Sequence, residues 1–364
     1  MTEYTQRTAF NDNWFIRTPM GPFAAATGQT PELRALTLPH DAMRDMNRVA
    51  DAPSGAASGY FPSAAWTYLK HFDAPADWQD AWIALEIDGA ASRSLVYING
   101  AKVASRPNGY ARFFVEIGPH LNYGGSNEIR IEVRTHKDSR WYSGAGLYRG
   151  VRLIVAGGVH IAPDGVRVST PDVDDHLACV EVATKLTNET RIVRTVRVST
   201  ELIDAGGEST GSDTSPVSLL PGQTMQLRQR IFVRTPQRWS LETPTLYTAN
   251  VSVTEGDDEF DAMSVDFGIR TLQVDPVRGF RLNGTTVKMR GTCIHHDNGP
   301  LGGVSLPRAE ERRIALLKAA GFNAIRTAHN PASQALLDAC DRVGMLVMNE
   351  AFDMWTDEKT EFDL

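Results

Sequence analysis

The chain has 364 residues, of which 42% are hydrophobic, and its formal net charge is −7. This length allows two or three globular domains with ordinary cores. The acidic balance and the absence of any dense Lys/Arg run argue against a nucleic-acid backbone or an anionic membrane as partner, because both favour a basic surface.

The N-terminal segment and the cysteines indicate the compartment. The start, MTEYTQRTAFNDNW, lacks the basic and apolar regions of a secretory signal, and no apolar run has the length of a membrane span. We therefore expect a cytoplasmic protein. Cys179, Cys293 and Cys340 show no CxxC spacing and have apolar neighbours, which predicts buried free thiols in a reducing environment.

Residues 1–158 have the pattern of a β domain. Apolar residues alternate at Ile83, Leu85 and Ile87 and again over residues 129–133, which predicts half-buried strands. Asn99-Gly100 lies between two apolar runs and predicts a tight hairpin turn. Many short strands with little helical periodicity favour a β jelly-roll sandwich.

Residues 159–272 form a second all-β block. Apolar positions alternate at Met225 and Leu227, over residues 231–233 and over residues 251–253, with turn-rich segments such as DAGGESTGSD between them. Strands at this spacing over about a hundred residues predict an immunoglobulin-like β-sandwich.

Residues 273–364 change period. A hairpin around Asn283-Gly284 leads into an apolar strand that ends near Cys293. Helical character then begins at Pro307 and ends before Gly321, followed by the short strand FNAIR, a helix over residues 333–343 closed by Gly344, and the strand MLVM. Strands that alternate with helices must pair in parallel, so this part predicts the first three βα units of a (β/α)₈ TIM barrel.

Each predicted helix has an apolar stripe, and the strands have two apolar faces. The stripes are Ile314, Leu317 and either Ala320 or Leu316 in the first helix, and Leu336, Leu337, Cys340 and Val343 in the second. Three parallel strands cannot close a barrel, so we expect the inner face of the sheet to be exposed. Either the natural protein continues, or another chain completes the barrel.

Ionisable side chains gather where the three parallel strands end: His295, His296, Arg326, His329 and Glu350. Active sites of such barrels lie at the carboxyl ends of the strands, so this cluster indicates catalysis. Arg326 is costly to bury alone, and Glu350 at the end of the neighbouring strand is its predicted partner. The alternative is a purely structural ion pair with His329 as an ordinary loop histidine.

Several separated motifs resemble glycoside hydrolase family 2, which comprises β-galactosidases, β-glucuronidases and β-mannosidases. NAIRTAHNP, followed by LL, Asp341, Gly344 and MLVM, is similar to the first signature of that family. The family often has Tyr where this chain has Asn330, and the HNP form resembles β-galactosidase-like members. RGTCIHHDNGPLGG and NEAFDMW resemble the first and third barrel strands of the family, and SRWYSGAGLYRGV and TPQRWSLETPTLY resemble landmarks of its two β domains.

The resemblance implies roles for individual residues. It implies that His295 and His329 contact sugar hydroxyls and stabilise the transition state, and that Glu350 orients them or binds a metal. Further residues implied or considered for sugar contact are Asp138, reaching across from the jelly roll, Arg326 beside the histidines, and Trp141, Tyr142 and Trp355 at the rim. Core packing is the alternative for Trp355. No cofactor is required, with a Mg or Na ion left open.

The catalytic carboxyl pair is expected elsewhere. Retaining glycoside hydrolysis needs a nucleophile and an acid about 5 Å apart. The family carries its acid in an Asn-Glu pair at the end of the fourth barrel strand, whereas Glu350 follows the third. The resemblance therefore implies that the acid and the nucleophile lie beyond Leu364, and that this chain alone is inactive.

The leading hypothesis is a glycosidase of the β-galactosidase type that hydrolyses terminal non-reducing β-linked sugars with retention. Its partner is a carbohydrate, and the full-length protein is a candidate homo-oligomer. The HNP and DNGPLGG forms favour galactoside over glucuronide, and β-glucuronidase or β-mannosidase specificity is the alternative. A second alternative to the leading hypothesis is a non-catalytic carbohydrate-binding or complementation fragment.

A metal-dependent barrel hydrolase is the remaining hypothesis, with His295, His296, His329 and Glu350 as ligands. Adjacent histidines on a strand point to opposite faces, which weighs against that ligand set.

Overall fold

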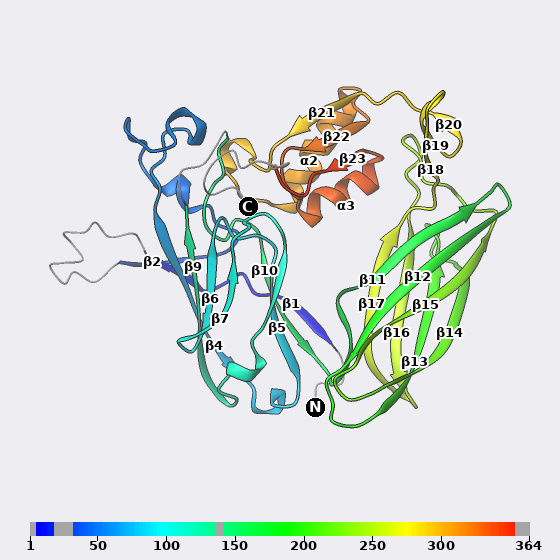
Figure 1. Ribbon diagram of the computed structural model, residues 1–364, viewed down its shortest axis with the longest axis horizontal. Helices are drawn as coiled ribbons and strands as arrows, with labels where there is room; N and C mark the ends of the chain where they lie inside the picture. The colour runs from blue at the N-terminus through cyan, green and yellow to red at the C-terminus, as the bar shows by residue number, and fades with distance from the viewer. Residues whose placement is uncertain (1–4, 18–31, 136–140, 354–364) are drawn as a thin grey trace.

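The computed structural model describes residues 5–17, 32–135 and 141–353. Figure 1 shows two β-sandwiches side by side, with a small parallel sheet and its two helices lying across one end of both. Among the described residues, no helix is long and apolar enough to cross a membrane.

The first sandwich consists of two antiparallel sheets. One has the strand order β1 (Gln6–Ala9), β10 (Val151–Ala156), β5 (Trp82–Ile87) and β8 (Phe113–Glu116). The other has the order β3 (Leu33–Leu36), β2 (Trp14–Arg17), β4 (Ala65–Ala74), β9 (Gly125–Arg134), β6 (Ser94–Ile98) and β7 (Ala101–Arg106). Their inner faces meet in one core around Trp14, Tyr68 and Leu85, as the jelly-roll prediction requires.

Short 3₁₀ helices lie in the connections: η1 (Ala42–Asp45), η2 (Gly55–Ser58), η3 (Ala76–Trp78), η4 (Gly118–His120) and η5 (Gly299–Leu301). The turn between β6 and β7 has positive φ at both Asn99 and Gly100, which confirms the predicted hairpin. The prediction of a half-buried strand at β5 is wrong, because Ile83 to Ile87 are all buried. Its outer face is covered around Glu86, which pairs with Arg112 and Arg152.

The second sandwich follows directly on β10. Its sheets have the orders β11 (Val159–Val173), β12 (Leu177–Asn188), β15 (Thr224–Arg234), and β14 (Ser209–Leu219), β13 (Arg194–Ile203), β16 (Tyr247–Glu255), β17 (Asp258–Phe267). The alternation predicted in β15 and β16 is present, and the inward side chains pack around Val180, Val198 and Val251. The immunoglobulin-like prediction is confirmed.

The third part begins with a small sheet of β18 (Leu272–Asp275), β19 (Gly279–Leu282) and β20 (Thr285–Thr286). The βα units follow as β21 (Gly291–Ile294), α2 (Pro307–Ala319), β22 (Ala324–Thr327), α3 (Gln334–Val343) and β23 (Leu346–Asn349). β21, β22 and β23 pair in parallel, as predicted. Ser333 caps α3 by accepting a hydrogen bond from the Leu336 amide, and Gly344 ends it with a φ of +77°.

The helices cover the outer face of the parallel sheet. Ile314, Leu336 and Cys340 are buried against Ile325, whereas Leu316 is exposed, so Leu316 does not belong to the stripe. The inner face is divided. In one layer of side chains Cys293 and Met348 are exposed and Arg326 is half-buried, but Ala324 and Leu346 pack against Trp239 and Leu282.

Two predictions are corrected by this arrangement. The expectation of an exposed inner face is wrong for its lower layer, because Trp239 and Leu241 from the connection between β15 and β16, together with Leu282 of β19, cover Ala324 and Leu346. The expectation of three buried thiols is also wrong: Cys340 is buried, Cys179 is half-buried and Cys293 is exposed. Cys293 is exposed because it lies in the layer of the inner face that no described segment covers, level with Arg326 and Met348.

Candidate functional site

Three rings from two domains meet at the carboxyl end of the parallel sheet. His295 follows β21, His329 follows β22, and Trp141 comes from the connection between β9 and β10 of the jelly roll. The Trp141 ring centroid lies 5.4 Å from that of His295 and 5.3 Å from that of His329, and the two imidazoles are 5.6 Å apart. The sequence predicted the two histidines together, and the structure brings Trp141 between them.

Glu350 lies behind His329 at the end of β23. One carboxylate oxygen accepts a hydrogen bond from Arg326 Nε, and the other lies 3.1 Å from His329 Nδ1. Asp353 Oδ1 is 3.5 Å from the same nitrogen. Because carboxylates accept hydrogen bonds, Nδ1 carries the hydrogen, and in the neutral imidazole Nε2 is then the acceptor. The predicted ion pair is present, and the hydrogen bond that Arg326 donates to Glu350 raises the pKa of Arg326.

His296 has a different environment from its neighbour. Its Nε2 lies 2.8 Å from the carbonyl oxygen of Ser143, so Nε2 carries the hydrogen. The ring packs against Tyr110 at 4.9 Å and Tyr148 at 5.6 Å. Burial lowers the pKa of His296 to about 3. His296 is therefore a half-buried side chain that is neutral at pH 7, and the two adjacent histidines do point in different directions, as predicted.

Helix α2 holds the loop that carries both histidines. Arg313 donates hydrogen bonds to the carbonyl oxygens of His295, at 3.0 Å, and Asp297. Glu310, one turn earlier, lies 3.5 Å from Arg313 and is almost fully buried, which raises the pKa of its carboxyl group. The backbone that presents His295 is thus fixed from the helix side.

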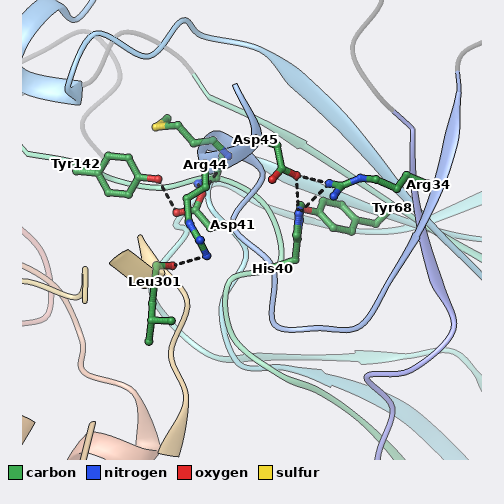
Figure 2. Close-up of polar contacts among 10 residues, drawn as sticks. Arg34, His40, Asp41, Arg44, Asp45, Tyr68, Tyr142 and Leu301 are labelled. Carbon is green, nitrogen blue, oxygen red and sulfur yellow. Dashed lines mark hydrogen bonds and ion pairs between the residues drawn. The ribbon is translucent and has the colours of Figure 1, made fainter. Parts of the chain in front are cut away.

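Asp41 fixes the same loop from the jelly-roll side (Figure 2). This buried carboxylate accepts hydrogen bonds from four donors: the amides of Met43, Ala145 and Gly303 and the hydroxyl of Tyr142, at 2.6 to 3.0 Å. Gly303 belongs to the barrel loop between β21 and α2, so one side chain joins two domains. Arg44 adds a longer contact, 3.4 Å, to the carbonyl of Leu301.

A second polar group braces η1 from the other side, as Figure 2 also shows. His40 Nδ1 lies 2.8 Å from the hydroxyl of Tyr68, and His40 Nε2 lies 3.0 Å from Asp45. Arg34 donates to the same carboxylate. Burial lowers the pKa of His40 although Asp45 opposes that effect. This group supports Asp41 and does not face the three rings.

The remaining predicted site residues have different outcomes. Asp138 and Trp355 lie outside the described residues. Tyr142 does not turn its polar end to the rings, because its hydroxyl is bound to Asp41. Within residues 5–17, 32–135 and 141–353, no group of three His, Cys, Asp or Glu side chains could hold a metal ion, so the geometry gives the metal-hydrolase hypothesis no support.

Sequence reasoning missed Asp41, Tyr110 and Arg313. Asp41 Oδ2 and the amide of Gly303 are 262 residues apart in the chain, and no local pattern predicts such a contact. Arg313 was within the predicted helix, one turn after Glu310, so its position facing the strand ends was in principle deducible from helical geometry.

Two β-sandwiches followed by a parallel βα sheet, with imidazoles and an indole at its strand ends, define a modular protein with three barrel βα units at its end. The sequence profiles agree. Residues 43–142 match the glycosyl hydrolase 2 galactose-binding domain-like profile, residues 159–270 match glycosyl hydrolases family 2, and residues 275–357 match its TIM barrel domain. The chain belongs to glycosyl hydrolase family 2.

Similar proteins cover nearly the whole chain. It is 37% identical over 361 residues to the beta-galactosidase BoGH2A of Bacteroides ovatus and 29% identical over 350 residues to a putative beta-glucuronidase of Formosa agariphila. These matches span 98% and 96% of this chain but 42% and 33% of the relatives. A family 2 glycosyl hydrolase structure from Bacteroides cellulosilyticus superposes with a TM-score of 0.92 at 34% identity, over 98% of this chain and 47% of that one.

Proposed function

We propose that this chain is the substrate-positioning part of a retaining glycosidase of the β-galactosidase type, acting on terminal non-reducing β-linked sugars. The observation that carries the proposal is the cluster of His295, His329 and Trp141 at the strand ends, backed by Glu350. An indole ring packs well on the apolar face of a pyranose, and imidazole nitrogens bind its hydroxyls.

In this proposal each group has a separate task. Trp141 orients the sugar ring, and His329 Nε2 accepts a hydrogen bond from a sugar hydroxyl, while Glu350 keeps the hydrogen on Nδ1 and the ring oriented. Arg326 fixes Glu350 in turn. Hydrogen bonds to sugar hydroxyls that strengthen in the transition state contribute to glycosidase catalysis. Asp138 and Trp355 remain candidates for further sugar contacts.

The acid and the nucleophile are proposed to come from barrel strands after residue 364. Both carboxylate oxygens of Glu350 are engaged, one by Arg326 and one by His329, so Glu350 is poorly placed to protonate a glycosidic oxygen. The relatives are more than twice as long as the matched region, which leaves room for those strands. The 364-residue chain alone should therefore bind but not hydrolyse its sugar.

Galactose is the proposed sugar, on the basis of the HNP and DNGPLGG segments. The most similar relative quoted above is named a beta-galactosidase, which supports galactose. A second relative is named a putative beta-glucuronidase, so glucuronide is the second candidate. A Mg or Na ion near the site and a homo-oligomer of the whole protein stay open proposals.

The test compares two chromogenic substrates with two proteins. The intact protein, expressed from its complete gene, should hydrolyse p-nitrophenyl β-galactoside faster than the β-glucuronide, and a reversed preference would replace galactose by glucuronic acid. The 364-residue chain should bind galactose without turnover. Hydrolysis by that chain in the presence of a chelator would refute the proposal that its acid and nucleophile lie after residue 364. No turnover by the intact protein, with sugar binding retained, would favour a non-catalytic carbohydrate-binding protein.

A further inference from the structure

Arg149 joins the jelly roll to the loop that carries His329. It lies immediately before β10 and is only 2% exposed. Its guanidinium donates to the carbonyl oxygens of Tyr110 at 2.7 Å, Pro331 at 3.0 Å and Asp88 at 3.4 Å. We propose that Arg149 is a positioning residue of the sugar site, which sets His329 relative to Glu350 and Trp141. This inference rests on the proposed function.

The contact with Pro331 leads to Glu350 through the backbone. The carbonyl of Pro331 and the amide of Ala332 belong to one peptide group, and that amide donates to Asn349 Oδ1 at 3.2 Å. The peptide group is therefore held on one side by the jelly roll and on the other by β23. Since it lies two residues after His329, its orientation restricts where the imidazole can lie.

The network continues along the strand ends. Asn349 Oδ1 also accepts a hydrogen bond from the hydroxyl of Thr327 at 2.9 Å, and that hydroxyl accepts one from the amide of Glu350 at 3.0 Å. Thr327 and Glu350 flank the loop on neighbouring strands. Arg149 thus connects to the backbone of the residue whose carboxylate orients His329.

The contact with Tyr110 leads to the indole. Arg149 binds the carbonyl oxygen of Tyr110, and the hydroxyl of the same residue accepts a hydrogen bond from Trp141 Nε1 at 3.2 Å. One guanidinium therefore holds both walls of the proposed site, the loop of His329 and the support of Trp141. Arginine suits this task because its planar fork directs several N–H groups at fixed angles.

Physical reasoning favours positioning over stabilisation. The three groups that accept hydrogen bonds from Arg149 are carbonyl oxygens, which compensate a buried cation less well than a hydrogen-bonded carboxylate does, and Glu310 interacts with it only through space. An apolar side chain of similar length would avoid that cost of burial. Such a side chain would not make the three hydrogen bonds that fix the segments of Asp88, Tyr110 and Pro331 relative to one another.

Amide hydrogen exchange of the intact protein tests the inference without a substrate. In Arg149→Met, the amide of Ala332 should exchange at least about tenfold faster, while the amide of Gly303 keeps its protection. Asp41→Asn is the mirrored variant, because it removes an acceptor from Gly303 and leaves Pro331 untouched. It should give the opposite pattern. Arg149→Lys should restore part of the protection at Ala332.

Sugar binding supplies the second readout. Arg149→Met should raise the inhibition constant of galactose about tenfold, and Arg149→Lys should recover part of the lost affinity. Arg152→Met, which removes an exposed arginine of β10, should change neither the inhibition constant nor the exchange rate at Ala332. Unchanged exchange at Ala332, or an equal loss at Ala332 and Gly303, would overturn the inference. If the parent protein binds no galactose, the proposed function fails, whereas the exchange experiment still decides on Arg149.

Discussion

The loops after β21 and β22 both leave the parallel sheet at its carboxyl end, and both present a histidine, but their surroundings differ. His296 in the first loop is enclosed by two tyrosine rings and bound to a carbonyl oxygen. His329 in the second is 24% exposed and faces two carboxylates. Both imidazoles are half-buried, but one packs against two tyrosine rings and the other lies beside two carboxylates and Trp141. Changes around His296 should therefore alter stability, and changes around His329 should alter sugar binding.

The largest effect is expected at Asp41, the anchor of the first loop. Asp41→Ala leaves the buried amides of Met43, Ala145 and Gly303 without their acceptor, at a cost of about 4 kcal/mol in the free energy of unfolding. Urea denaturation measures it. Asp45→Ala, at a half-exposed carboxylate, should cost less than about 1 kcal/mol. An equal loss of unfolding free energy in the two variants would contradict the special role of Asp41 as an anchor of the first loop.

The pH dependence of stability should come next, through His296. Its pKa is about 3 in the folded protein against an ordinary value of 6.5, so the unfolded chain binds a proton first as the pH falls. The free energy of unfolding should decrease between pH 6.5 and about 3, by about 1.4 kcal/mol per pH unit from this group.

His296→Gln keeps a donor for the carbonyl of Ser143 and does not titrate. Urea denaturation at several pH values should show about 2 kcal/mol less loss between pH 6.5 and pH 4.5 in this variant. His120→Gln, at an exposed histidine, serves as control. A variant that loses stability with the parent slope would show that His296 is not the titrating group.

A smaller effect is expected at Glu350, which follows β23 and contacts His329 of the second loop. Glu350→Gln keeps the shape but removes the charge that Arg326 and His329 share, so the dissociation constant of galactose should rise about 30-fold, or about 2 kcal/mol. Titration calorimetry measures it, with Glu311→Gln on the exposed face of α2 as control. If Glu350→Gln changes the free energy of unfolding but not the affinity for galactose, Glu350 has a structural role like that of Asp41.

The smallest effect is expected at Trp141. Trp141→Leu keeps an apolar contact but loses the aromatic face, which should weaken galactose binding about fivefold to tenfold, about 1 kcal/mol, with little change in stability. Trp82→Leu is the matched control, because Trp82 stacks on His160 at 4.9 Å, between the two sandwiches. Equal affinities in the two variants would exclude Trp141 from the site.

The order of the elements was predictable from the sequence because the signals are local. Asn99-Gly100 and Asn283-Gly284 adopt the positive φ angles that hairpins need, and Ser333 and Gly344 bound a helix by their own hydrogen bonding and conformational freedom. Parallel pairing of β21, β22 and β23 followed from the alternation of strands and helices. His295, His329 and Glu350 were found because strand ends of a parallel sheet converge.

Burial and partners needed the tertiary structure. The exposure of Cys293, the burial of Ala324 under Trp239 and the covered outer face of β5 depend on which segments pack on each sheet. No periodicity contains that information, because alternation shows which residues share a face but not what covers it.

The sequence by itself determined three successive folding units and the residues that end their parallel strands. Tertiary structure decided which side chains surround each of those residues. His296 and His329 are equivalent as residue types, and only the contacts that the jelly roll makes, through Ser143 to one and Trp141 to the other, separate them. The physical reason is that a hydrogen-bond partner and a desolvated surface are set by the three-dimensional neighbours of a group, which the chain supplies from more than a hundred residues away.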